Sequence, residues 1–155
     1  MAVTETKNII TGALTQALEI MAFLDALPSK EQSEVPSVVI TADIDFVGPI
    51  SGTIRMAAGI DFARMLAENI SGLEELTEAQ CIDAMQELVN VTCGLVLPMI
   101  AYDRADVFDM TVPHLTRSED RLQWVDFISQ DDVTVLDVEG WPVATRLIVK
   151  LQQPG

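Results

Sequence analysis

The stretch TEAQCIDAMQELVNVTCGLVLPMIAY, residues 77–102, predicts a long amphipathic helix around which the rest of the chain is organised. At about 100° per residue, its apolar side chains gather on one face of this helix. Four residues form a single stripe on the opposite face: Asp83, Glu87, Asn90 and Gly94. Thr77 and Gln80 have the spacing of a capping box, which marks the helix start. We therefore expect the polar stripe to point away from the core.

The length and composition of the chain favour one ordinary globular domain. At 155 residues, with 49% hydrophobic residues, the chain is long enough to bury a core without disulfides or metals. Its mean hydropathy is +0.30, yet no run reaches the roughly 18 apolar residues that a membrane span needs. We expect a single domain over residues 1–155.

The N-terminal residues and the cysteines point to the cytoplasm. The first residues lack the basic start and continuous apolar core of a signal peptide. Cys81 and Cys93 lie twelve residues apart on the predicted helix, too far for a disulfide, and unpaired thiols fit a reducing compartment. The expected localisation is cytoplasmic.

The charge balance excludes several classes of partner. Acidic side chains number 24 against 9 basic ones, which gives a net charge of −15, and no Lys or Arg cluster interrupts this excess. Nucleic acid and anionic membrane surfaces are therefore poor partners, which leaves a protein or a small molecule. His114 is the only histidine of the sequence, and neither cysteine has a partner at metal spacing, so we expect no metal site.

Hydrophobic periodicity predicts the remaining elements. Apolar residues at spacings of three and four predict further helices at 4–26 and 59–70. Alternation and turn residues predict strands, at 36–46, 50–57, 109–116, 123–128, 133–138 and 143–151. Residues 139–142 are expected to turn the last two strands into a hairpin. The order contains no evident internal repeat. The expected fold class is α+β, with a mainly antiparallel sheet of about six strands and three helices packed on it.

The polar pair Glu87 and Asn90 is not specific by itself. Glu5 and Asn8 repeat the same spacing near the N-terminus. Solvated polar residues on an exposed helix face are the ordinary explanation for such a pair. The spacing alone therefore does not identify a site.

A longer pattern is more specific. It reads Asp83-x3-Glu87-x2-Asn90-x22-Pro113. This pattern resembles the signature of the CheC, CheX and FliY phosphatases of bacterial chemotaxis. The surroundings, with Ser-Gly-Thr at 51–53 before the second helix, look like the CheX branch, and the similarity covers roughly residues 5–151. The single copy of the signature fits CheX better than CheC, whose members commonly carry two.

The resemblance implies a function and a partner. CheX-like domains remove the phosphoryl group from the aspartate of a phosphorylated CheY-type response regulator. By this resemblance Asn90 lies beside the acyl phosphate and orients the attacking water, while Glu87 meets the active-site lysine of the regulator. Asp83 and Gly94 belong to the partner-binding surface. The chain needs no cofactor of its own, because Mg²⁺ is expected on the regulator, and a homodimer is expected because CheX proteins dimerise.

The residue types suit these roles on physical grounds. An amide has no useful pKa, so Asn90 can position groups by hydrogen bonding but cannot transfer protons. Phosphoryl transfer depends mainly on such placement and on electrostatics. Gly94, one turn further on, leaves room for close approach of a partner. Pro113 offers no donor, and its expected role is structural, beside the helix.

Two alternatives remain open at this level. Relatives often have glycine or another small residue immediately before the asparagine, whereas this chain has Val89, whose predicted direction is toward the core. The first alternative is a CheX-like module that binds a regulator without catalysis. The second is a purely structural or oligomeric domain. The sequence names neither the regulator nor the pathway.

Overall fold

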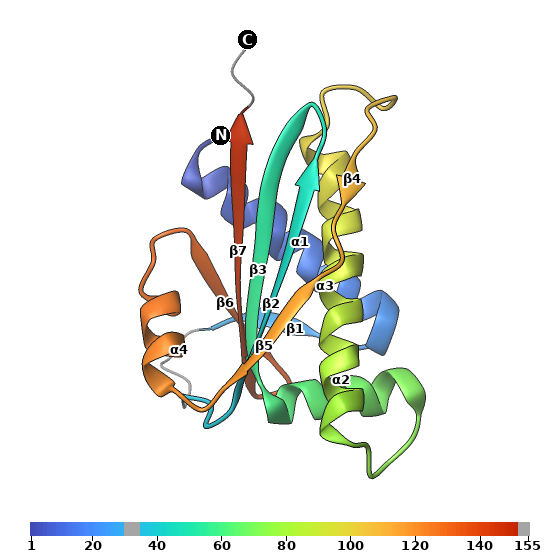
Figure 1. Cartoon of the computed structure of the whole chain (residues 1–155), viewed down its shortest axis with the longest axis vertical. Helices are drawn as coiled ribbons and strands as arrows, with labels where there is room; N and C mark the ends of the chain where they lie inside the picture. The colour runs from blue at the N-terminus through green and yellow to red at the C-terminus, as the bar shows by residue number, and fades with distance from the viewer. Residues whose placement is uncertain (30–34, 152–155) are drawn as a thin grey trace.

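Four helices and seven strands form the described part of the chain, residues 1–29 and 35–151 of this computed structural model (Figure 1). The helices are Val3–Ala22 (α1), Ile60–Ser71 (α2), Glu78–Ile100 (α3) and Arg121–Ile128 (α4). The strands are Ala26–Pro28 (β1), Val39–Val47 (β2), Ile50–Gly59 (β3), Asp109–Met110 (β4), His114–Ser118 (β5), Val133–Val138 (β6) and Trp141–Leu151 (β7). Residues 30–34 and 152–155, which the single-domain prediction includes, lie outside the described residues.

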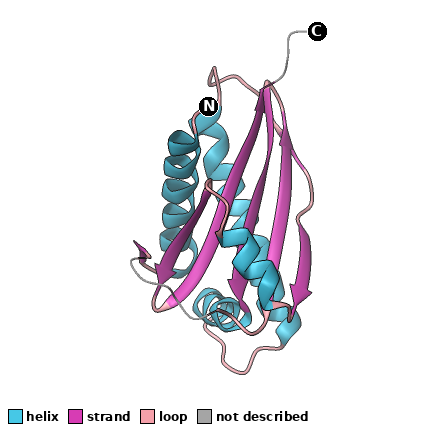
Figure 2. Cartoon of the chain, turned by 90° about the vertical axis from the view of Figure 1, so that its left-hand side faces the viewer, coloured by secondary structure: helices cyan, strands magenta, loops and turns pink. Residues whose placement is uncertain are grey.

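The described strands belong to one antiparallel sheet, which Figure 2 shows in magenta. The strand order is β1-β6-β7-β3-β2-β4, and β5 also pairs with β2. The predicted hairpins are confirmed: β2 pairs with β3, and β6 pairs with β7. The second turn is tighter than expected, because only Glu139 and Gly140 have positive φ and Pro142 already lies in β7. Two successive residues with positive φ are typical of a two-residue hairpin turn.

The core lies between one face of the sheet and the helices α1, α2 and α3. Period-two alternation explains the sheet side of this core, since Ile40, Ala42, Ile44 and Phe46 of β2 are all buried in it. Helix α1 packs over β6 and β7, whereas α3 packs over β2 and β3, and the two helices contact each other. The α+β prediction is therefore confirmed.

Residues 123–128, predicted as a strand, form helix α4 instead. Asp120 begins this helix, because its Oδ1 accepts a hydrogen bond of 2.9 Å from the backbone N–H of Leu122. Trp124 and Phe127, one turn apart, are buried against apolar residues on the other face of the sheet. The prediction of three helices is thus wrong by one, and α4 covers the face opposite to the main core.

The edges of the sheet also differ from the prediction. The first helix was expected to reach residue 26, but it ends at Ala22, where Phe23 adopts φ 55° and donates its backbone N–H to Glu19 O. The short strand β1 follows and pairs with β6. The expected strand at 109–116 is divided into β4 and β5, which pair in turn with β2.

The order of the strands in the sheet contains a structural repeat. This repeat was not evident from the order of the predicted elements along the chain. Helix α1, edge strand β1 and the β2–β3 hairpin form one unit, and α3, the β4–β5 edge and the β6–β7 hairpin form the second. The two hairpins meet where β3 pairs with β7, and each edge strand pairs with the hairpin of the other unit. Each long helix likewise covers the hairpin of the other unit. The two units are therefore related by an approximate two-fold arrangement.

Candidate functional site

Helix α3 begins where the sequence predicts. The backbone N–H of Gln80 donates to Thr77 Oγ1 at 3.2 Å, and the backbone N–H of Thr77 donates to Gln80 Oε1 at 2.8 Å. This reciprocal pair is the predicted capping box, and it satisfies N–H groups that the first helical turn leaves without partners. The cap sets the register of the helix and hence the direction of every side chain along it.

The buried face of α3 matches its predicted apolar face with one exception. Met85, Leu88, Val89 and Val96 are all fully buried. Val89 therefore points into the core, as expected, and not toward the polar stripe. The exception is Met99, an apolar residue on this side of the helix, which is 46% exposed because it lies in the last turn, where α3 ends at Ile100.

The polar stripe lies on the opposite, outward face of α3. Asp83, Glu87 and Gly94 are exposed, and Asn90 is half-buried. Within the described residues, the side chains of Asp83, Glu87 and Asn90 make no hydrogen bond or ion pair. Their carboxylate and amide groups are therefore available to another molecule, on a long helix that the core holds in place.

Gly94 stands out because the fold does not need a glycine there. A Cβ built at this position meets nothing within 4 Å, so alanine would fit without any shift. Glycine inside a helix is nevertheless less stable than alanine by about 1 kcal/mol. A residue that weakens the helix without helping the packing is consistent with close approach of a partner at this point.

Pro113 comes from the edge of the sheet beside α3. It is buried, and it lies in the segment between β4 and β5. Asp43 pairs with His114 and Phe46 pairs with Met110, so the edge has one more residue than β2 between these pairs. This extra residue is a bulge, one of the few places in a sheet where proline is tolerated. Pro113 therefore lies at a position where the sheet can accommodate a proline.

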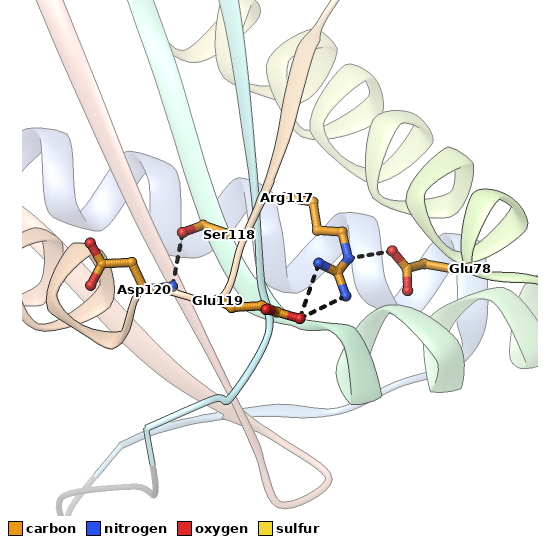
Figure 3. A network of polar contacts seen from close by, with 5 residues as sticks. All are labelled: Glu78, Arg117, Ser118, Glu119 and Asp120. Atoms are coloured by element: carbon orange, nitrogen blue, oxygen red, sulfur yellow. Dashed lines mark hydrogen bonds and ion pairs between the residues drawn. The ribbon is translucent and has the colours of Figure 1, made fainter.

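An ionic network attaches β5 to the start of α3 (Figure 3). Arg117 of β5 donates its Nε–H to Glu78 in the first turn of α3, and its two terminal nitrogens lie 3.4 Å from Glu119 Oε1. The hydrogen bond and charge of Glu78 raise the pKa of Arg117. Sequence reasoning missed this contact, because a single arginine in a strand does not indicate its partner 39 residues away.

The groups of this site can position a partner, supply negative charge and, at the carboxylates, accept a proton. The stripe offers two carboxylates and one amide, which can accept hydrogen bonds, and the amide can also donate. The described residues contain no group of three or more His, Cys, Asp or Glu side chains able to hold a metal ion. His114, in β5, is exposed. Such a surface suits the recognition of a partner that carries its own reactive group.

The fold and this helix define the class of the protein. An antiparallel sheet with long helices on one face, one of them bearing the outward-facing pair Glu87-x2-Asn90, is the arrangement expected for CheC- and CheX-like domains. The family model described as chemotaxis phosphatase CheX matches residues 40–126, more than half of the chain. The chain belongs to the CheX family. The matched region contains all of α3, the stripe and Pro113, whereas α1 lies outside it.

Solved structures of low sequence identity share the fold. The chemotaxis protein CheX from Vibrio vulnificus is 17% identical, with a TM-score of 0.69 over 97% of this chain and 99% of that one. The Borrelia burgdorferi chain from a CheX-CheY-BeF3-Mg complex is 14% identical, with a TM-score of 0.67 over 94% and 97%. Thermotoga maritima FliY is 15% identical, with a TM-score of 0.59 over 93% and 86%. The comparison with curated proteins found no match.

Among the residues that the structure describes, no helix combines the length and the apolar character that crossing a membrane requires.

Proposed function

We propose that this chain binds a phosphorylated CheY-type response regulator through the outward stripe of α3 and accelerates hydrolysis of its aspartyl phosphate. The observation that carries the proposal is the pair Glu87 and Asn90, which lie one helical turn apart, face outward and make no side-chain hydrogen bond within the described residues. Membership of the CheX family supports it. The Borrelia burgdorferi relative, solved together with CheY, BeF3 and Mg²⁺, supports the choice of partner.

The proposed role of Asn90 is to place a water molecule for attack on phosphorus. The water oxygen forms a bond to phosphorus, the bond from phosphorus to the aspartyl oxygen breaks, and the products are the regulator's carboxylate and inorganic phosphate. The amide can accept a hydrogen bond from the water and donate one to a phosphoryl oxygen. The transition state is loose, so placement and charge neutralisation provide most of the acceleration. The Mg²⁺ that neutralises the phosphoryl charge is expected on the regulator, and this chain supplies no cofactor.

The proposed role of Glu87 is electrostatic contact with the partner. Glu87 is exposed and lies on the same stripe as Asn90, so a lysine at the regulator's phosphorylation site can approach both residues at once. Asp83, one turn before Glu87, adds negative charge, and Gly94, one turn after Asn90, removes the side chain that would hold the partner away. Opposite charges placed in this way steer association and determine orientation. The partner is a cytoplasmic protein, so we place this chain in the cytoplasm.

The test is the effect of Asn90→Ala on a single turnover. Phosphorylated regulator is mixed with saturating protein, and the decay of its aspartyl phosphate is followed for wild type and variant. Loss of the positioning amide is expected to lower the rate by about 10² or more, with binding largely kept. Gln123→Ala is the matched control, because Gln123 is an exposed helix amide on α4, on the other side of the sheet.

The outcomes separate catalysis from docking. A folded Asn90→Ala protein that turns over as fast as wild type would contradict the catalytic role of Asn90. Wild-type protein that binds the regulator but leaves the decay rate unchanged would indicate a docking module without catalysis. Thermal unfolding of each variant establishes that the comparison is made between folded proteins.

A further inference from the structure

A cavity of about 350 Å³ lies on the face of the sheet that α4 covers. Residues of β2, β3 and β5 line one side of this α4 cavity, and residues of α4 line the other. Its volume is at the lower end of the range of roughly 300–1,000 Å³ that small-molecule sites occupy. The sheet separates the cavity from the α3 stripe, which consists of Asp83, Glu87, Asn90 and Gly94. The α4 cavity is therefore distinct from the site described above.

The apolar part of the cavity wall is held in place by the packing of α4 on the sheet. Val39 and Ala57 come from neighbouring strands, Trp124 and Phe127 come from α4, and each of the four is at most 8% exposed. They pack together in the smaller of the two hydrophobic clusters. A preformed cavity with an apolar wall and a few polar groups is typical of small-molecule sites.

Arg55 contributes a positive charge whose hydrogen-bonding capacity is only partly used. Its Nε donates to Asp43 Oδ1 at 2.6 Å, and its Nη2 lies 3.5 Å from Asp43 Oδ2. The two residues occupy directly paired positions of β2 and β3. Within the described residues Nη1 makes no hydrogen bond, so it is available to a carboxylate. Asp43 thus holds the guanidinium in place and leaves donors for a ligand.

The α4 side of the cavity contributes a negative charge and two amides. Asp126, Gln123 and Gln130 line the cavity and are exposed, so its mouth is open to solvent. Thr41 and Thr116, which pair across β2 and β5, add two hydroxyl groups. In the part of the chain that the structure describes, none of these five side chains makes a hydrogen bond or an ion pair. Their polar groups are therefore free to bind a ligand.

This combination of groups matches a zwitterion. A carboxylate can accept hydrogen bonds from Arg55, and an ammonium group can donate to Asp126. A zwitterion has no net charge, whereas a simple carboxylate is repelled by a chain of net charge −15. The amides can bind either charged group, and an aliphatic side chain gains from leaving water for the apolar wall.

We propose that the α4 cavity binds a free α-amino acid with an aliphatic side chain. Arg55 binds its carboxylate, Asp126 binds its ammonium group, and its side chain packs against Val39 and Ala57. The inference goes beyond the proposed function and does not depend on it, because the cavity and the α3 stripe lie on opposite faces of the sheet. Variants of the cavity, assayed without amino acid, should therefore leave turnover of the regulator's aspartyl phosphate unchanged.

The test is titration calorimetry of the whole chain with L-alanine, L-valine and L-leucine. Isoamylamine and isocaproate have the carbon skeleton of leucine without its carboxylate or its ammonium group, respectively. At least one of the amino acids is expected to bind saturably and to raise the Tm. Each leucine analogue should bind at least about tenfold more weakly than L-leucine, because it lacks one charge-assisted hydrogen bond. The proposal is overturned if none of the amino acids binds at millimolar concentration, or if either analogue binds as tightly as L-leucine.

Two variants test the charged groups of the cavity. Asp126→Asn and Arg55→Gln should each weaken binding of the amino acid by about tenfold or more. Asp61→Asn is the control for the first, because Asp61 is an exposed carboxylate on α2. Arg146→Gln is the control for the second, because Arg146 forms the same kind of ion pair, at 2.7 Å from Asp132, but does not line the cavity. Equal losses in a variant and its control would contradict the assigned contact.

A third variant tests the location without removing a charge. Thr116 is exposed on β5, and tryptophan is favoured in strands, so Thr116→Trp should fold. Its large side chain should occupy the cavity and abolish binding of the amino acid. A folded Thr116→Trp protein, verified by thermal unfolding, that binds the amino acid as tightly as wild type would overturn the assignment of the ligand to the α4 cavity.

Discussion

Replacement of Gly94 by alanine should make the protein more stable and its binding weaker. The two effects have opposite signs because they have different causes. Within the chain, a Cβ at position 94 meets nothing within 4 Å, so alanine introduces no clash and only improves helix propensity. Between molecules, the same methyl group occupies the space into which a partner is proposed to move. An ordinary structural residue would not show this combination.

The expected magnitudes follow from general energetics. Exchange of glycine for alanine inside a helix should raise the free energy of unfolding by about 1 kcal/mol, which corresponds to roughly 2–4 °C in Tm for a domain of this size. An extra methyl group in a closely packed contact costs about 1–3 kcal/mol. The affinity of the α3 stripe should therefore fall by about 5-fold to 150-fold.

The assay combines urea or thermal unfolding with titration of beryllofluoride-activated regulator. Gly12→Ala is the reference for stability alone, since it is an equally unobstructed glycine inside a helix. A stabilised Gly94→Ala protein with unchanged affinity would refute close approach at this position. A destabilised one would refute the reasoning from the open space around Gly94.

Three further predictions concern the partner, the core and the assembly. Glu87→Lys should weaken binding of the regulator to α3 by several kcal/mol, because it places a positive charge against the regulator's lysine. Asp126→Lys, on an exposed residue of α4, should leave this affinity unchanged. Titration of the activated regulator measures both variants, and a Glu87→Lys affinity equal to that of wild type would contradict the proposed lysine contact. Burial raises the pKa of the Cys93 thiol from 9.0 to about 11. The unfolded chain therefore loses this proton first, and the free energy of unfolding should be fully retained below pH 9 and fall by up to about 3 kcal/mol between pH 9 and 11. Urea unfolding across this range should show a shallower fall for Cys93→Ala, and identical slopes would exclude the thiol as the cause. The chain should form a homodimer, because an apolar sequence with sheet edges gains from covering them; a light-scattering mass near 16.9 kDa at micromolar and higher concentrations would oppose this.

The sequence alone determined the features that depend on local periodicity. The register of α3 follows from its apolar repeat and from the Thr77 cap, and these place Glu87 and Asn90 on the outward face. The two hairpins follow from alternation and from turn residues, because neighbouring strands are joined by short connections. Each of these inferences uses residues that lie within one turn, one strand or one hairpin of each other, so no knowledge of the tertiary structure was needed.

The tertiary structure decided everything that depends on contacts between distant segments. Residues 123–128 carry a pattern too short to separate a strand from a helix, and burial of Trp124 against the far face of the sheet selects the helix. Strand β1 exists only because β6, more than 100 residues further along, pairs with it. The relation between the β2–β3 and β6–β7 hairpins also became visible only there, because it depends on the pairing of β3 with β7. Strand pairing and packing across a core join residues that are far apart in sequence, and local patterns carry no information about those partners.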